Sequence, residues 1–169
     1  MHKKTLLAVL ALALAGTALA QTADQPRFYK LDFVVKEVEG GKTVNSRTFS
    51  SMLGVQLPGR ETPAATIRAG GRVPVATSGS NNASFSYFDL GVNIDARDLR
   101  ESQADVSVYL SVDISTIGQE TAGAQPVVRQ NRWAGLVLVP VKKATVVFAS
   151  DDITSKRQLQ LEMTATPVR

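Results

Sequence analysis

Three polar residues lie at a spacing that could support chemistry on one face of a predicted strand. Asp89, Asn93 and Asp95 alternate with apolar residues, so in an extended chain all three project to the same side. Oxygen ligands in such a row are typical of a calcium site, and a pair of carboxylates is typical of acid/base hydrolysis. No spacing here matches a calcium-loop motif, so solvent-facing residues of an amphipathic strand are the simpler interpretation.

A second polar segment surrounds the sole tryptophan. Arg129 and Arg132 flank two further polar residues, and Trp133 follows directly. An exposed Trp133 would offer a stacking platform for a ligand, whereas a lone tryptophan in a strand is more often a core or rim anchor. We take Arg129, Arg132 and Trp133 as an interaction surface, together with the polar face formed by Asp89, Asn93 and Asp95.

Nucleophilic and metal-dependent catalysis have few residues to use. The only histidine is His2, and the sequence has no cysteine. Without them there is no Ser-His-Asp triad, no cysteine nucleophile and no His- or Cys-ligated zinc site. Phosphate-cradling and dinucleotide-binding glycine motifs are also missing. The sequence therefore predicts a protein that is not an enzyme and has no cofactor and no metal; a carboxylate-dependent hydrolase using Asp89, Asp95 or Asp151 is the remaining catalytic hypothesis.

The N-terminus predicts export. A short basic segment precedes an apolar run, and Ala18 and Ala20 place small residues where a signal peptidase cleaves. We therefore predict a cleaved signal helix over residues 1–20 and a single mature domain over residues 21–169, periplasmic or secreted from a bacterium. Losing Lys3 and Lys4 lowers the basic count from 19 to 17 against 15 acidic residues, a net charge of +2. This near-neutral balance argues against nucleic acid as a partner, and we expect no membrane span in the mature chain.

The mature sequence has the period-two hydrophobicity of strands throughout. Gly40-Gly41 predicts the turn of a hairpin over residues 27–53, whose second arm is rich in Thr and Ser and is expected at an edge or facing solvent. Gly70-Gly71 predicts a break between two short strands, of which the second contains Pro74 and belongs at an edge or bulge. We expect loops over residues 78–84 and 118–125, and one helical turn over residues 99–103.

These strands favour an all-β fold. Two long segments, 88–95 and 106–114, alternate between apolar and polar residues, as in antiparallel sheets with one buried and one solvated face. About eight or nine strands with short connections predict an antiparallel β-sandwich or a small open barrel.

The order of several motifs resembles the C-terminal β-domain of bacterial secretins, the channel proteins of type II and type III secretion and pilus systems. The similar segments are Gly70-Gly71-Arg72-Val73-Pro74-Val75, Tyr87-Phe88-Asp89-Leu90-Gly91-Val92, the alternating strand 106–114, Ala144-Thr145-Val146-Val147 and the final strand ending at Pro167. The resemblance covers residues 64–168 and implies a secretin-like β fold. It departs where Phe148-Ala149-Ser150 replaces the glycine pair that usually follows Thr-Val-Val, and it lacks the periplasmic modules that precede the channel domain.

The function predicted from these features is a non-catalytic structural or interaction module of the cell envelope. Free sheet edges would pair with a protein partner or with another copy, and the resemblance implies membership of an envelope complex. The alternative is a periplasmic carrier of a small apolar ligand, bound in a cavity lined by aromatic residues.

Overall fold

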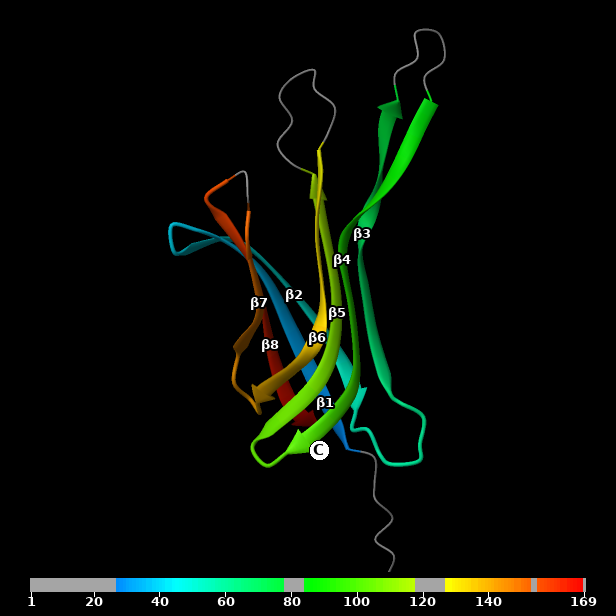
Figure 1. Ribbon diagram of the computed structural model, residues 1–169, viewed down its shortest axis with the longest axis vertical. Coiled ribbons are helices and arrows are strands. Elements are labelled where there is room, and N and C mark those ends of the chain that lie inside the picture. Colours follow the sequence, from blue (N-terminus) through cyan, green and yellow to red (C-terminus); the bar gives the residue numbers. More distant parts are fainter. Residues whose placement is uncertain (1–26, 78–83, 118–126, 153–154, 169) are drawn as a thin grey trace, which may run out of the picture.

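The protein is described by a computed structural model that covers residues 27–77, 84–117, 127–152 and 155–168. These residues form eight strands and no helix (Figure 1). The strands are β1 (Phe28–Glu39), β2 (Lys42–Gly54), β3 (Ala64–Thr77), β4 (Ser84–Ser102), β5 (Asp105–Ile117), β6 (Val128–Pro140), β7 (Thr145–Asp151) and β8 (Arg157–Val168). Over the same ranges, no helix is long and apolar enough to cross a membrane.

The eight strands make two antiparallel four-stranded sheets. One sheet has the order β2-β1-β8-β7 and is called sheet A here; the other has the order β3-β4-β5-β6 and is called sheet B. The predicted all-β antiparallel sandwich is confirmed, and because no strand is shared between the sheets the open-barrel alternative is not adopted. The predicted signal helix lies outside the described residues.

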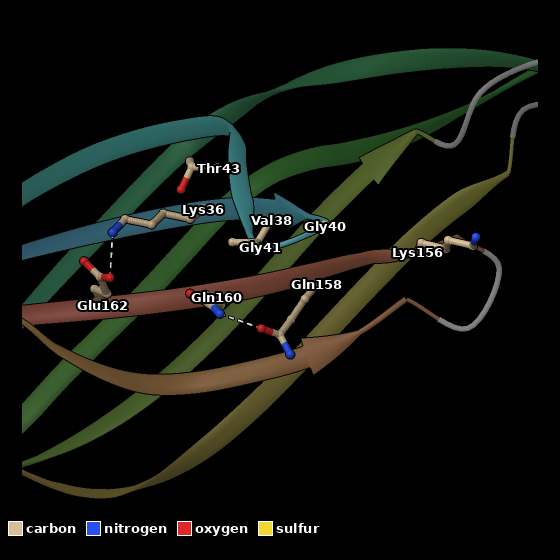
Figure 2. Close-up of a pocket in the computed structure, with 9 residues that line it drawn as sticks. All are labelled: Lys36, Val38, Gly40, Gly41, Thr43, Lys156, Gln158, Gln160 and Glu162. Carbon is tan, nitrogen blue, oxygen red and sulfur yellow. Dashed lines mark hydrogen bonds and ion pairs between the residues drawn. The ribbon is translucent and has the colours of Figure 1, made fainter.

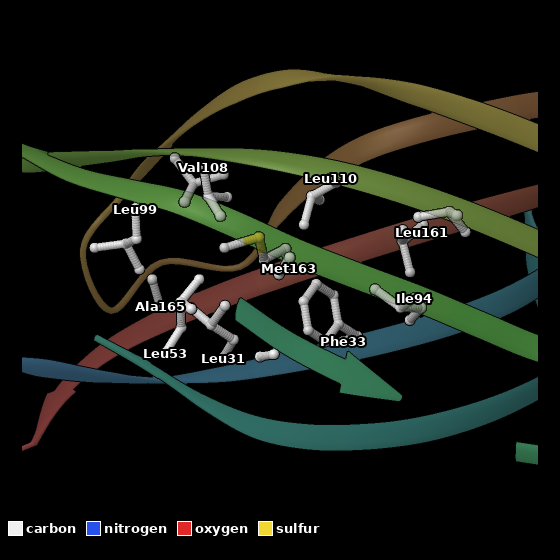
Figure 3. Close-up of a cluster of buried hydrophobic side chains, with 14 of the residues drawn as sticks. Leu31, Phe33, Leu53, Ile94, Leu99, Val108, Leu110, Leu161, Met163 and Ala165 are labelled. Atoms are coloured by element: carbon white, nitrogen blue, oxygen red, sulfur yellow. The ribbon is translucent and has the colours of Figure 1, made fainter. Parts of the chain in front are cut away.

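A single apolar cluster fills the space between the two sheets (Figure 3). Alternate residues of the central strands supply it, because successive side chains of a strand point to opposite faces. From sheet A come Tyr29, Leu31, Phe33 and Val35 of β1 and Leu161, Met163 and Ala165 of β8; from sheet B come Val92, Ile94 and Ala96 of β4 and Val106, Val108, Leu110, Val112 and Ile114 of β5.

The first hairpin is built as the sequence predicts. Gly40 and Gly41 have φ values of 57° and 78°, which glycine adopts at no steric cost, and they join β1 to β2. The Thr- and Ser-rich strand β2 pairs only with β1, so its predicted edge position is confirmed.

The second hairpin, formed by β3 and β4, differs from the sequence prediction in two respects. The glycine pair at 70–71 does not break the chain, because β3 runs through it as one strand from Ala64 to Thr77. Residues 99–103 form no helical turn, because β4 continues to Ser102. The predicted edge position of Pro74 is confirmed, since β3 pairs with β4 alone. The predicted loops over residues 78–84 and 118–125 lie outside the described residues except for Ser84, where the loop prediction is wrong because β4 begins there.

A close contact between two backbones bends this second hairpin. Gly70 lies directly opposite Gly91, and a Cβ built on either glycine would come well inside 3.0 Å of the facing strand. The pairing between β4 and β5 begins at Gly91, where the Ser115 hydroxyl accepts the Gly91 N–H (3.0 Å) and donates to the Asp89 carbonyl (3.2 Å). Beyond this point β3 and β4 run on as a two-stranded ribbon (Figure 1).

Tyr29 should make the stability of the domain depend on pH at the alkaline end. Burial, followed by its hydrogen bond to Glu101 (2.8 Å), raises the pKa of Tyr29 from 10.0 to about 12. Because the folded-state pKa lies above the unfolded one, this stabilisation is complete below pH 10 and is lost as the pH rises towards 12. Denaturant unfolding across that window should show a steeper loss for the natural chain than for Tyr29→Phe. Equal slopes for the two proteins would contradict it.

Candidate interaction surfaces

The acidic residues singled out in the sequence lie on the outer face of sheet B, the face that points away from sheet A. Each of the two carboxylates meets an arginine of the neighbouring strand β3. Asp95 accepts two hydrogen bonds from the Arg68 guanidinium (2.8 and 2.9 Å) and one from Thr66 (2.9 Å). Asp89 accepts one from Arg72 at 2.9 Å, and this contact lowers the pKa of its carboxyl. Asn93 lies between them, opposite Arg68 in the strand pairing.

A third carboxylate extends this row across the sheet. Asp113 on β5 accepts hydrogen bonds from Gln130 and from Arg132 on β6 (2.8 Å to Arg132 Nη2). Burial alone would raise the pKa of Asp113, but these hydrogen bonds hold it below the usual value. The antiparallel pairing places Asp113 directly opposite Arg132, so only knowledge of the register could have found this contact.

The outer face of sheet B therefore carries ion pairs between neighbouring strands, with arginines on the edge strands β3 and β6 and aspartates on the central strands β4 and β5. Carboxylates engaged by guanidinium groups have fewer lone pairs to offer a cation. In the described part of the chain, no group of three or more His, Cys, Asp or Glu side chains is arranged to hold a metal ion. These ion pairs are better suited to holding neighbouring strands together on a solvated face than to forming a calcium site or an acid/base pair.

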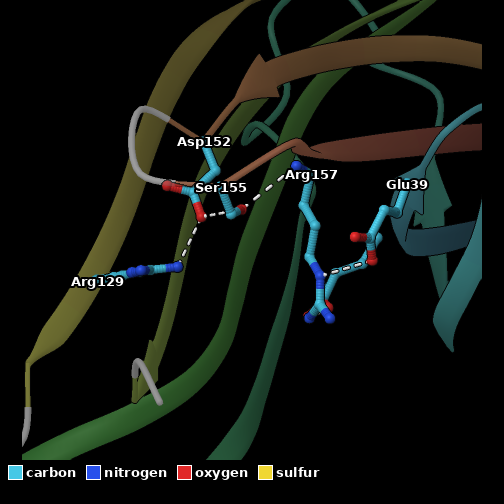
Figure 4. Close-up of polar contacts among 6 residues, drawn as sticks. Glu39, Arg129, Asp152, Ser155 and Arg157 are labelled. Carbon is cyan, nitrogen blue, oxygen red and sulfur yellow. Dashed lines mark hydrogen bonds and ion pairs between the residues drawn. The ribbon is translucent and has the colours of Figure 1, made fainter. Parts of the chain in front are cut away.

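The second predicted group does not form one surface. Arg132 projects outward to Asp113, whereas Trp133, the next residue, points between the sheets. The Trp133 ring stacks on Phe148 of β7, with the ring centroids 5.8 Å apart. Arg129 reaches across to sheet A and meets Asp152 at 2.6 Å, next to the Ser155 hydroxyl (Figure 4). Arg129 and Trp133 thus tie β6 to the end of β7, while Arg132 belongs to the ion pairs of the outer face.

The structure adds a surface that the sequence analysis did not single out. On the outer face of β6, Leu136 and Leu138 are 69% and 60% exposed. Residues 133–139 carry no charge, and β6 is an edge strand. We call residues 133–139 of β6, with the exposed Leu136 and Leu138 on their outer face, the β6 edge patch. An uncharged run is visible in the sequence, but nothing there indicates that the strand has a free edge.

Sheet A presents a hollow on its outer face (Figure 2). Polar side chains dominate its lining: Lys36 pairs with Glu162 at 2.6 Å, and Gln160 hydrogen-bonds to Gln158. A separate narrow crevice between the sheets is lined by both apolar and polar residues, among them Val92, Ile114, Glu37 and Arg47. Neither has the aromatic lining that the ligand-carrier alternative predicts, and that alternative stays a prediction.

Comparison with known proteins finds similar folds among solved structures. No protein-family model and no curated protein matches the sequence. Among solved structures, the chain is similar to the secretin InvG of the Salmonella SPI-1 type III secretion injectisome, with a TM-score of 0.54 and 9% identity over 100% of this chain and 70% of that one. It is also similar to a chain of the Klebsiella pneumoniae type II secretion system outer membrane complex of PulD, PulS and the PulC HR domain (TM-score 0.53, 11% identity, 97% and 43%) and to Aeromonas hydrophila ExeD (TM-score 0.52, 11% identity, 98% and 52%).

This protein therefore has a divergent secretin-like fold, as the motif order predicted. Identities near 10% establish likeness of fold alone. The chain spans about half or less of the Klebsiella and Aeromonas chains that it matches.

Proposed function

We propose that this chain is a non-catalytic structural module of the bacterial cell envelope that associates with further copies of itself, side by side, through the free edges of both sheets. The observation that carries the proposal is the β6 edge patch. Natural proteins protect a free strand edge with charges, prolines, bulges or short length. Over residues 133–139, β6 has no charge and no proline, and its exposed outer side chains include two leucines.

The other three edges differ from β6. Strand β7 is short and irregular near Val146, and β2 is polar. Strand β3 carries two charges and a proline, at Arg68, Arg72 and Pro74. An added strand beside β6 would therefore pair backbone groups that no second strand of this chain pairs, and it would cover part of Leu136 and Leu138.

The strand directions allow this pairing to repeat. Each sheet has four antiparallel strands, so its two edge strands run in opposite directions. A copy displaced sideways without being inverted therefore brings β3 antiparallel to β6, and β2 antiparallel to β7. The edges of the two sheets also lie over one another. Edge strand β6 of sheet B lies against β7 and β8 of sheet A, and edge strand β2 of sheet A lies against β3 and β4 of sheet B. One displacement thus joins both sheets at once, in a head-to-tail contact that can continue from copy to copy.

The envelope location and the lack of catalysis rest on separate grounds. The predicted signal peptide over residues 1–20 would export the domain of residues 21–169. Solved structures with a similar fold include InvG, a secretin of a type III secretion injectisome, and a chain of a type II secretion system outer membrane complex. The sequence has no histidine after His2 and no cysteine, and Asp89 and Asp95 are engaged by arginines.

The solution mass of the chain lacking residues 1–20 tests the proposal. Light scattering should give a multiple of the single-chain mass for the natural protein. The double variant Leu136→Lys, Leu138→Lys should shift the equilibrium at least about tenfold towards the monomer, because two charges on an edge oppose strand addition. Ser111→Lys places a charge on the same face of the central strand β5 and serves as the matched control, which should associate as the natural chain does.

Two outcomes would contradict self-association. One is a natural chain that is monomeric at every concentration measured. The other is a leucine double variant that associates as strongly as the Ser111→Lys control. Trp133, the only tryptophan, gives a second readout, since it lies beside the proposed contact and its fluorescence should shift to the blue on association.

A further inference from the structure

Arg47 of β2 projects from the inner face of sheet A, the face that packs on sheet B. It lies directly opposite Val35 of β1, and residues that face each other in an antiparallel pair project to the same side of the sheet. Val35 points into the core and is 7% exposed, so the Arg47 side chain also points towards sheet B. The two sheets diverge towards the β1–β2 turn (Figure 1), and there Arg47 is exposed.

Arg47 lines the narrow crevice between the two sheets. The aliphatic part of the lining comes from both of them, with Val35 and Leu159 in sheet A and Val92 and Ile114 in sheet B. The volume of the crevice is about 50 Å³. Because one water molecule needs roughly 10–15 Å³ of cavity volume, the crevice has room for a branched alkyl group of about four carbons.

The charges at the crevice favour an anion. Glu37 also belongs to the lining, but its carboxylate pairs with Arg157 at 3.6 Å, and Arg157 pairs in turn with Glu39 at 3.1 Å. Among the described residues, no carboxylate forms an ion pair with Arg47. The Arg47 guanidinium is therefore a cation beside an aliphatic crevice, and its hydrogen-bond donors are open to a ligand.

A ligand that fits both parts of this site carries a short alkyl group and a carboxylate. A guanidinium group matches a carboxylate with two parallel hydrogen bonds, and an alkyl group between the sheets leaves water. Asn45 and Thr116 also line the crevice and can donate further hydrogen bonds. We propose that the crevice binds a small branched aliphatic carboxylic acid, with its alkyl group between the sheets and its carboxylate at Arg47.

This site goes beyond the proposed structural role and does not depend on it. The crevice is formed within one chain, and its lining includes no residue of the β6 edge patch. It also differs from the aromatic cavity of the ligand-carrier alternative, because aliphatic side chains and an arginine define its ligand.

Ligand-observed NMR titration with isovalerate tests the site on the chain lacking residues 1–20. Isovalerate joins an isobutyl group to a carboxylate, and the natural chain should bind it saturably. Acetate has the charge without the branched group, and isoamyl alcohol has the branched group without the charge. Each should bind about tenfold more weakly or worse, because each satisfies only one part of the site.

Three variants test the assigned residues. Arg47→Gln should weaken isovalerate binding by about tenfold or more, because it removes charge-assisted hydrogen bonds. Lys42→Gln is the matched control, since it removes a positive charge from the same strand outside the crevice lining and should bind as the natural chain does. Glu37→Gln should bind isovalerate more tightly, because it removes a negative charge from the lining. Weaker binding by Glu37→Gln would point to a cationic ligand and overturn the proposal.

Other outcomes also overturn the carboxylate site. It is wrong if isovalerate shows no saturable binding, if isoamyl alcohol binds as tightly as isovalerate, or if Arg47→Gln keeps the natural affinity. If Arg47→Gln keeps that affinity and also associates more strongly in light scattering, Arg47 protects the free edge of β2 and binds no ligand. If N-acetylleucine binds more than about tenfold more tightly than isovalerate, the ligand is the end of a peptide and not a small acid. A monomeric natural chain that binds isovalerate would contradict only the proposed self-association.

Discussion

Gly91→Ala should destabilise this domain by about 3 kcal/mol or more, far above the effect of a typical added methyl group. Gly91 has a φ of 148°, a conformation that residues with a side chain rarely adopt. An added Cβ would also meet the backbone of Ala69 and Gly70 on the facing strand, well inside 3.0 Å. Backbone atoms in a paired strand cannot rotate away, so β3 and β4 would have to separate.

Gly71→Ala is the matched control for this change. It adds the same methyl group to the same hairpin, but a Cβ there meets nothing within 4 Å. Its free energy of unfolding should stay within about 1 kcal/mol of the natural value or rise slightly, since alanine restricts the unfolded chain. Urea unfolding followed by circular dichroism measures both. Similar losses for the two variants would mean that the contact between Gly70 and Gly91 does not constrain the fold.

This glycine contact also shows where the sequence analysis was limited. Two glycines between short apolar segments predict a turn, and for Gly40-Gly41 that interpretation is correct. For Gly70-Gly71 it is wrong, because the glycine is required by a strand that is distant in the sequence. Only the register of β3 against β4 separates the two cases.

The strands themselves were the most predictable part of the fold. In β5, residues 106–114 alternate strictly because one face is buried against sheet A and the other is solvated. That pattern is a property of each strand alone. The order of strands within the sheets depends on pairing across the whole chain and could not be obtained from it.

For the predicted surface residues, too, the direction of each side chain could be predicted from its own strand, whereas its partners could not. The alternation placed Asp89, Asn93 and Asp95 on one face, as found, but their arginine partners come from neighbouring strands. Arg132 and Trp133 are adjacent in the sequence, and alternation alone indicates that they point in opposite directions. Their role as interaction residues stays a prediction. The β6 edge patch was missed because an edge is a property of the sheet and not of the strand.

The second large effect is expected at the centre of the core. Phe33 is fully buried in the cluster that joins the sheets (Figure 3), and Phe33→Ala should cost about 3–5 kcal/mol through lost burial and the cavity left behind. Phe85→Ala removes the same atoms from a side chain that is mostly exposed, so its cost should stay below about 1 kcal/mol. Urea unfolding of both variants measures the difference, and equal losses would contradict the assigned core.

Phe33 also tests whether the two sheets fold as one unit. It belongs to β1 in sheet A, whereas Trp133, the only tryptophan, belongs to β6 in sheet B. Because one apolar cluster joins the sheets, Phe33→Ala should lower the urea midpoint of Trp133 fluorescence as much as that of the circular dichroism signal. A fluorescence midpoint that does not move would mean that sheet B stays folded without the core contact. The head-to-tail pairing through both sheets would then lose its physical basis, since it requires their edges to be held in a fixed relation.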